Sequence, residues 1–111
     1  MHVCFILDDI MLQHQPLGVC YLSSILKAHG HRTSSINVDA ARDYGKRLKQ
    51  MGPDLLAFST TSSHADRYQQ VNREIRREMP DVFSLFGGPH PSFFPQMIDE
   101  DPEIDAMCRG E

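Results

Sequence analysis

The sequence predicts a doubly wound α/β domain, and three observations lead to that prediction. Short apolar runs alternate with amphipathic segments from one end of the chain to the other. The apolar runs are continuous, which is typical of strands that are buried on both faces of a parallel sheet. The chain shows no internal repeat, low-complexity tract or interdomain linker. We therefore expect one Rossmann-like domain of right-handed βαβ units, with a parallel five-stranded sheet in flavodoxin-type order.

The first half of the chain is expected to supply two strands and two helices. Residues 3–7 form a continuous apolar run, which we interpret as the first strand. The apolar positions that follow recur at helical spacing, at Leu17, Cys20, Tyr21, Ile25 and Ala28. Gly30 stands where a left-handed C-terminal cap is expected. Residues 33–38 are β-prone, and a second helix, which ends at Gly52-Pro53, has one apolar face at Ala41, Tyr44, Leu48 and Met51.

The second half continues the alternation. The expected elements are a strand at 55–59, a helix from Ala65 to Pro80, a strand at 82–86, a short helix at 95–100 and a last strand at 104–108. No covering helix follows the last strand in the sequence, so we expect the sheet to lack its last helix. Part of one face would then be bare and open to self-association. Residues 1–111 are expected to form one domain, the N-terminal fragment of a longer enzyme.

Composition places the chain among ordinary globular proteins. The hydrophobic fraction is 41%, the charged fraction is 23%, and no apolar run approaches the length of a membrane span. The first residues lack the pattern of a secretory signal, so a cytoplasmic location is the expectation. The net charge is −4, and the acids gathered in residues 99–111 are expected to be solvated. Neither residues 99–111 nor the rest of the chain resembles a nucleic-acid-binding surface.

The cysteines are too few and too scattered for a disulfide framework. They are Cys4, Cys20 and Cys108. We expect them to be reduced and at least partly buried. No Cys/His spacing resembles a zinc site, so no metal site is expected.

The segment from Gly87 to Pro95 is the most unusual part of the sequence. Two adjacent glycines permit positive φ angles and remove both Cβ atoms, and three prolines follow within seven residues. We expect this segment neither to continue the preceding strand nor to start an ordinary helix. Its composition predicts a place where the backbone closely approaches another group.

Three loops are expected to meet at one edge of the sheet, because each follows the carboxyl end of a parallel strand. Ligands of such sheets bind at this edge. The loops comprise residues 8–16, 59–64 and 87–95. Each contains one histidine that is a candidate for ligand contact or metal binding, namely His14, His64 and His90. The hydroxyl tract at residues 59–63 either donates hydrogen bonds to a ligand or caps the helix that follows.

The pair Asp8-Asp9 resembles the paired carboxylates of a receiver domain in two-component signalling. That resemblance does not extend further, since a receiver has its phosphorylated aspartate where this chain has Ser59. A receiver also needs a lysine after the fifth strand, whereas the last lysine here is Lys49. We therefore interpret the pair as a polar loop or a helix cap, and a phosphorylated receiver is the least favoured hypothesis.

Five motifs in a fixed order resemble one family. They are Pro16-Leu17-Gly18, Gly30-His31, Pro53-Asp54-Leu55 leading to Ser59, Gly87-Gly88-Pro89-His90-Pro91, and Ile104-Asp105-Ala106 leading to Arg109-Gly110-Glu111. Together they resemble the N-terminal cobalamin-binding domain of radical S-adenosylmethionine enzymes over nearly the whole chain. The resemblance implies a corrinoid held over the carboxyl ends of the strands. Its nucleotide tail would enter a groove lined by the loops after the third and fourth strands.

The resemblance also implies roles for individual residues. The expected cofactor-binding residues are Gln15, Pro16, Leu17, Gly18, Ser59, Thr60, Thr61, Gly87, Gly88, Pro89 and His90. Residues 15–18 would lie near the lower face of the corrin ring. The hydroxyls after the third strand would offer hydrogen bonds to the base of the tail, and the glycine pair would let the tail pass close to the backbone.

Two departures from the family pattern restrict what this chain is expected to do. Cobalamin proteins that ligate cobalt carry Asp-x-His-x-x-Gly in the first loop, but in an alignment on Gly18 this chain has Gln13 and Gln15 at the aspartate and histidine positions. We therefore expect no histidine ligand to cobalt from this chain. The Cys-x-x-x-Cys-x-x-Cys motif of a 4Fe-4S cluster is also absent. S-adenosylmethionine and the cluster would belong to a downstream radical domain, and no catalytic residue is expected here.

The sequence thus favours the cobalamin-binding module of an enzyme that catalyses methyl transfer or ring formation. The alternative is a docking or structural domain that has lost cobalamin binding, which the missing histidine and the acidic end keep open. A bulky residue at Gly88 is expected to distinguish the two hypotheses. The substitution should abolish the activity of the complete enzyme if this domain binds cobalamin, and leave it unchanged if the domain is structural.

Overall fold

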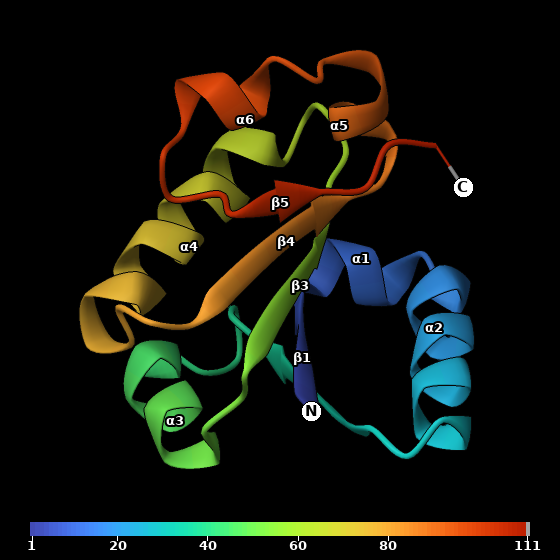
Figure 1. The fold of residues 1–111 in the computed structure, drawn as a ribbon, viewed down its shortest axis with the longest axis vertical. Helices are drawn as coiled ribbons and strands as arrows, with labels where there is room; N and C mark the ends of the chain where they lie inside the picture. The colour runs from blue at the N-terminus through green and yellow to red at the C-terminus, as the bar shows by residue number, and fades with distance from the viewer. Residues whose placement is uncertain (111) are drawn as a thin grey trace.

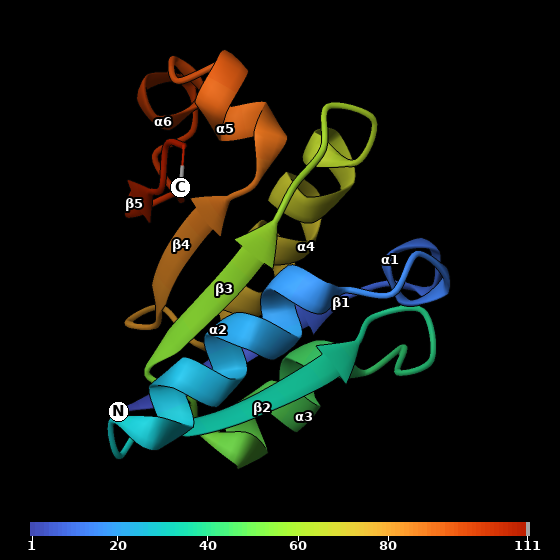
Figure 2. The same cartoon turned by 90° about the vertical axis from the view of Figure 1, so that its right-hand side faces the viewer.

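The sheet has five parallel strands in the order β2-β1-β3-β4-β5 (Figure 1 and Figure 2). The computed structural model describes residues 1–110. The strands are β1 (His2–Leu7), β2 (Arg32–Asn37), β3 (Leu55–Ser59), β4 (Phe83–Gly87) and β5 (Ala106–Met107). This order and the parallel pairing confirm the fold class predicted from the sequence. Glu111, the last residue of the fifth sequence motif, lies outside the described residues.

Helices lie on both faces of the sheet. They are α1 (Asp9–Gln13), α2 (Leu17–Ala28), α3 (Tyr44–Met51), α4 (Ala65–Glu78), α5 (Pro89–Phe93) and α6 (Met97–Glu100). Figure 2 shows α2 in front of the sheet, with α3 and α4 behind it. Gly30 and Gly52 follow α2 and α3 with positive φ angles, so both sequence-predicted helix ends are confirmed. None of the helices in residues 1–110 is both long and apolar enough to cross a membrane.

The larger core lies between the sheet and the helices α3 and α4. Side chains alternate between the faces of a strand, so Phe58 and Phe86 on neighbouring strands share this face. Their rings stack with centroids 4.4 Å apart, and Tyr68 of α4 packs edge-on against Phe58 at 5.8 Å. The opposite face has a smaller core, in which Val3, Phe5 and Leu7 of β1 pack against Val19 and Leu26 of α2.

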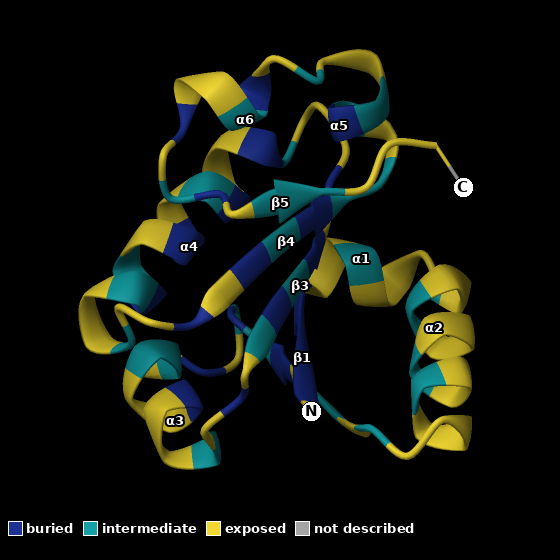
Figure 3. Ribbon diagram, viewed as in Figure 1, coloured by how far each residue is buried: buried dark blue, intermediate teal, exposed yellow. Residues whose placement is uncertain are grey.

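The sheet face on which α2 packs, called the α2 face below, is covered over only part of its width. None of the residues of α2 is buried (Figure 3), and the side chains of Leu17 and Tyr21 are 72% and 69% exposed. The helix covers the β1 side of the sheet, whereas Phe83 on β4 is exposed and Leu85 is half-buried. On this face Leu55 and Ala57 of β3 pack with the α2 cluster, whereas in the described part of the chain β4 has no such cover. A partly bare sheet face, as expected, is therefore present in residues 1–110.

The helix α1 begins where a polar loop or a helix cap was expected. The Asp8 side chain accepts a hydrogen bond from the backbone N–H of Met11 at 2.7 Å, which makes Asp8 the N-cap. The helix-cap interpretation of the Asp8-Asp9 pair is thus confirmed. Asp8 is 1% exposed, so it is not an accessible acceptor of a phosphoryl group.

The expectation that residues 87–95 neither continue a strand nor start a helix was wrong. Gly87 is the last residue of β4 and pairs with Ser59 of β3. Pro89 then occupies the first position of α5. Proline is well tolerated there, because the N–H that it lacks would have no partner within the helix.

The acidic segment at residues 99–110 is more than a solvated end, contrary to expectation. Asp101 is 2% exposed and lies 3.4 Å from Arg73 of α4. Arg76 of the same helix pairs with Asp105. Both arginines lie on α4 and pair with carboxylates of the acidic segment. These ion pairs hold the short strand β5 against β4.

Candidate cofactor site

A groove of about 710 Å³ lies between α2 and the uncovered half of the sheet. The residues that line it are Phe5, Met11, Pro16, Gly18, Val19, Tyr21, Leu22, Ala57, Phe58, Ser59, Leu85, Gly87, Gly88, Cys108 and Gly110. In the strand order β1 stands between β2 and β3, so the chain reverses its direction of progress across the sheet at β1. In open α/β sheets, ligands bind at this switch point, beyond the carboxyl ends of the strands.

The floor of the groove is a trough of small residues between two larger ones. Phe5 and Leu85 are both in register with Ala57, one on each neighbouring strand. Ser59 and Gly87 form the next pair toward the carboxyl edge. Alternate residues of a strand share one face, so all five positions lie on the α2 face. The three small residues leave room along β3 and the end of β4, where a larger side chain would fill the groove.

The groove brings together some of the residues predicted to bind the cofactor and leaves others out. Those that line it are Pro16, Gly18, Ser59, Gly87 and Gly88. Those outside its lining are Gln15, Leu17, Thr60, Thr61, Pro89 and His90. The latter lie in the loops around the carboxyl edge of the sheet, where their roles toward a cofactor stay predictions.

Thr60 braces the groove from behind. It is fully buried, and both its hydroxyl and its backbone N–H donate to the carbonyl oxygen of Gly87, at 3.0 and 2.8 Å. Thr61 is exposed, and its hydroxyl lies 3.0 Å from Nδ1 of His64. His90 joins the same two loops, because its ring nitrogen lies 3.0 Å from the Ser62 hydroxyl. These contacts fix the loop after β3 to the end of β4.

Gly88 is required by the packing of these two loops. Its φ angle is +94°, and a Cβ on it would lie 2.8 Å from both the nitrogen and the oxygen of the Thr60 backbone. No L-residue side chain fits at that distance from a backbone. At Gly87, by contrast, a Cβ would have its nearest contacts at 3.7 Å from Cβ of Cys108 and 3.9 Å from the Phe58 oxygen, which is ordinary packing.

The turn between α1 and α2 is strained at Gln15. Its φ angle is +52°, a value that is uncommon for any residue other than glycine, and its carbonyl oxygen accepts from the Leu17 N–H at 2.7 Å. Gln15 is exposed, and Pro16 after it lines the groove. The turn therefore brings residues 15–18 to the mouth of the groove, the region that the sequence assigned to the lower face of a corrin ring.

A polar network fixes the start of α1 and hence this turn. Asp39, in the loop after β2, accepts from the Asp9 N–H at 2.8 Å and pairs with Arg67 of α4. Arg67 also lies 3.8 Å from the buried Asp8 carboxylate. Burial, followed by the charge of Asp8, raises the pKa of the Tyr68 hydroxyl beside it. The network ties the first loop to α4 on the opposite face of the sheet.

This network predicts an acid-sensitive contribution to stability. The hydrogen bond from Arg67, and then that from the Asp9 N–H, lowers the pKa of Asp39. Its stabilising effect is therefore complete well above the unfolded pKa of about 3.9 and is lost as the pH falls through the lower folded value. We expect Asp39→Asn to cost about 0.5–1 kcal/mol near neutral pH and progressively less as the pH falls below about 3.9, measured by urea unfolding.

A matched control for this substitution is Asp43→Asn, which removes a carboxylate from an exposed pair with Arg47. It is expected to change stability by a few tenths of a kcal/mol at most. An Asp39→Asn variant whose loss of stability did not shrink at all as the pH fell below about 3.9 would show that the carboxylate charge is not the source of the effect.

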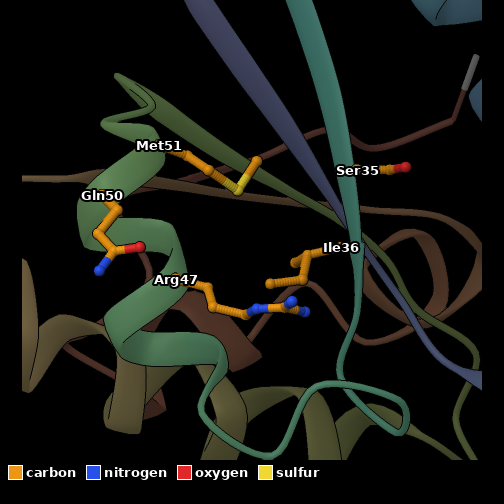
Figure 4. A pocket seen from close by; sticks show the side chains of 5 residues that line it. All are labelled: Ser35, Ile36, Arg47, Gln50 and Met51. Carbon is orange, nitrogen blue, oxygen red and sulfur yellow. The ribbon is translucent and has the colours of Figure 1, made fainter.

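A second hollow, of about 380 Å³, lies between α3 and the edge strand β2 (Figure 4). Arg47 and Met51 extend from α3 toward Ile36, whereas Ser35 points to the other side of the strand. It contains none of the residues predicted to bind a cofactor. It lies on the α3 face of the sheet, opposite to the face that carries the groove.

The cysteines differ in exposure. Cys4 is buried in the core, and this burial raises the pKa of its thiol. Cys20 and Cys108 are exposed, so the expectation of at least partial burial was wrong for these two. Cys20 lies on α2 and Cys108 lines the groove, and covering structure is lacking at both places. Among residues 1–110, no three His, Cys, Asp or Glu side chains are placed to hold a metal ion together.

Several residues of the groove were not predicted from the sequence. Phe5, Ala57 and Leu85 form its floor, and Val19 and Leu22 of α2 line it from the other side. Strand alternation could have shown that the first three share a face. Their apolar character gave no signal, because a ligand groove and a core contact use the same residue types.

The fold and the groove together define an α/β domain with a groove at the switch point, the place where domains of this class bind ligands. Comparison with known families gives a more specific assignment, since the model described as "B12 binding domain" matches residues 3–111. The chain belongs to the B12-binding domain family. The resemblance to a cobalamin-binding domain inferred from the five motifs is thus confirmed.

Similar proteins are much longer than this chain. It is 34% identical over 106 residues to the anaerobic magnesium-protoporphyrin IX monomethyl ester cyclase of Rubrivivax gelatinosus, which aligns with 86% of this chain and 18% of that protein. It is 35% identical over 102 residues to an uncharacterised methyltransferase of Pyrococcus horikoshii, with 86% and 22% covered. A cytidylyl-2-hydroxyethylphosphonate methyltransferase of Streptomyces wedmorensis is 25% identical, again with 86% and 22% covered. The chain spans about a fifth of the length of these relatives.

Proposed function

We propose that this chain is the cobalamin-binding module of a radical S-adenosylmethionine enzyme that catalyses methyl transfer or ring formation. The observation that carries the proposal is the groove at the switch point, lined by Ser59, Gly87 and Gly88, in a member of the B12-binding domain family. The names of the relatives, a cyclase and two methyltransferases, support the two reaction types.

The groove fits the nucleotide tail of a corrinoid. Its volume of about 710 Å³ falls within the range of small-molecule sites, roughly 300–1,000 Å³. At the mouth, Ser59 and Gly87 leave space for a chain to turn inward from the carboxyl edge of the sheet. Further in, Phe5 and Leu85 offer apolar walls against which a planar base can pack.

The residues of this chain would hold and orient the cofactor. The exposed Ser59 hydroxyl would donate a hydrogen bond to a polar atom of the tail. Phe5, Ala57 and Leu85 would exclude water from its base, and the turn at Gln15 would lie near the lower face of the ring. When bound, the corrinoid supplies a cobalt centre that carries methyl groups or electrons.

Radical generation would require a further domain. The cysteines of this chain are not spaced as Cys-x-x-x-Cys-x-x-Cys, so a 4Fe-4S cluster and S-adenosylmethionine would bind to a downstream radical domain of the same polypeptide. That domain is the expected partner of the corrinoid. A cytoplasmic location, and self-association through the uncovered sheet face, also stay predictions.

Retention of a corrinoid tests the proposed function. Purified protein is mixed with hydroxocobalamin, desalted, and examined by visible spectroscopy. We expect the corrinoid absorption to stay with the protein, because the groove removes the tail from water. If neither this chain nor a longer protein that contains it retains any corrinoid, the proposal is overturned.

The second candidate is a docking or structural domain that has lost cobalamin binding. The observation that favours it is Gln15, which stands where a cobalt-ligating histidine is found in other cobalamin proteins. A substitution that fills the groove without disturbing the fold separates the two candidates. It should abolish the activity of the complete enzyme only if the groove binds the cofactor.

A further inference from the structure

Few polar side chains line the groove, and they are exposed. The lining includes Ser59, Cys108 and Tyr21 as the side chains with a hydroxyl or thiol, and all three are exposed. The floor is different. Phe5 is 5% exposed, and Ala57 and Leu85 are half-buried and purely apolar.

The backbone of the floor has no hydrogen-bonding capacity to spare. Phe5, Ala57 and Leu85 belong to three adjacent strands, and β3 is paired on both sides, with β1 and with β4. Their N–H and C=O groups are therefore used within the sheet. Any polar atom that a ligand buries against this floor is left without a protein partner.

We propose that the groove selects corrinoids with a benzimidazole lower base over those with a purine lower base, and that Ala57 sets the depth at which the base lies. This inference rests on the proposed function. A purine such as adenine carries ring nitrogens and an exocyclic amine, and each loses its hydrogen bonds to water on burial here. A dimethylbenzimidazole carries two methyl groups on its six-membered ring instead, and burial of these groups is favourable.

Ala57 has a particular part in this selection because of its place in the register. It lies between Phe5 and Leu85, and its single methyl group makes the lowest point of the trough. A leucine there would occupy the space between the two walls. A serine would leave the space open and add one hydroxyl at the floor, where a polar base could use it.

The experiment compares the affinities of three corrinoids for the purified protein by equilibrium dialysis. The probes are cobalamin, its adenine analogue pseudocobalamin, and cobinamide, which lacks the nucleotide tail. We expect cobalamin to bind about tenfold or more tightly than pseudocobalamin. Equal affinity for cobalamin and pseudocobalamin would overturn the inference and leave the proposed function standing. Failure of all three probes to bind would overturn the proposed function itself.

Two variants test the part of Ala57. Ala57→Leu is expected to reduce the affinity for cobalamin to that for cobinamide, with cobinamide binding unchanged. Ala57→Ser is expected to narrow the preference for cobalamin over pseudocobalamin. The matched control is Ala106→Leu on β5, in register with Leu85 but outside the groove lining, which should leave all three affinities unchanged. Circular dichroism would show whether both variants are folded. If both are folded and still prefer cobalamin over pseudocobalamin as strongly as the original protein, Ala57 does not set this preference.

Discussion

Gly87→Leu is expected to weaken cobalamin binding by about 10- to 100-fold while leaving the protein folded. Gly87 lies two residues after Leu85 on β4 and therefore on the same face of the sheet, toward the groove. A side chain there would leave the backbone beside Cβ of Cys108, which also lines the groove. Leucine would thus occupy the mouth through which the tail must pass. Equilibrium dialysis with cobalamin measures the loss.

The fold should tolerate this change, because the first carbon of the new side chain has no contact closer than 3.7 Å. Gly87→Ala serves as the control, with an expected change in unfolding free energy within about 1 kcal/mol and a smaller loss of affinity. A folded Gly87→Leu protein that bound cobalamin as tightly as the original would exclude the groove as the tail site.

Gly88→Ala is expected to destabilise the protein by about 2–4 kcal/mol, whatever the ligand. Two effects add up. The φ angle of +94° is unfavourable for alanine, and the new Cβ would meet the Thr60 backbone at 2.8 Å on both its nitrogen and its oxygen. The strand end and the buried Thr60 cannot both stay in place. Urea unfolding in the absence of any corrinoid measures the loss.

This result would change how the two functional candidates are separated. The sequence indicated a bulky residue at Gly88 as the decisive substitution, but such a protein would lose activity by misfolding under either candidate. Gly87 provides the informative test, because the fold can accept a side chain at Gly87 but not at Gly88. A Gly88→Ala protein as stable as Gly87→Ala would contradict the packing of Gly88 against Thr60.

The sequence predicted the elements well wherever a local signal exists. The helix at Leu17–Ala28 and the strand at Leu55–Ser59 have the predicted bounds, since helical spacing and a continuous apolar run are properties of the residues themselves. The helices α1 and α5 escaped prediction because they are too short to show a period. The acidic end was misjudged because its partners, Arg73 and Arg76, lie about thirty residues away in α4.

The residues of the site were predicted less completely than the fold. The unusual loops pointed to Ser59 and Gly87, which the structure brings together as a pair at the mouth of the groove. Thr60 has the same kind of side chain as its neighbour, yet it faces inward and braces the end of β4. Only the pairing of two strands distant in sequence distinguishes a residue that lines the groove from one that supports it.

By itself, the sequence determined the α/β class, the parallel sheet and the edge at which a ligand should bind. These follow from periodicity, which each segment carries locally. The tertiary structure alone decided that α2 covers only the β1 side of its face, so that Ala57 and Leu85 become the floor of a groove. It also decided that Gly88 belongs to the packing against Thr60. The reason is physical: whether an apolar residue lies in a core or in a binding groove depends on what packs above it, and that is set by distant elements.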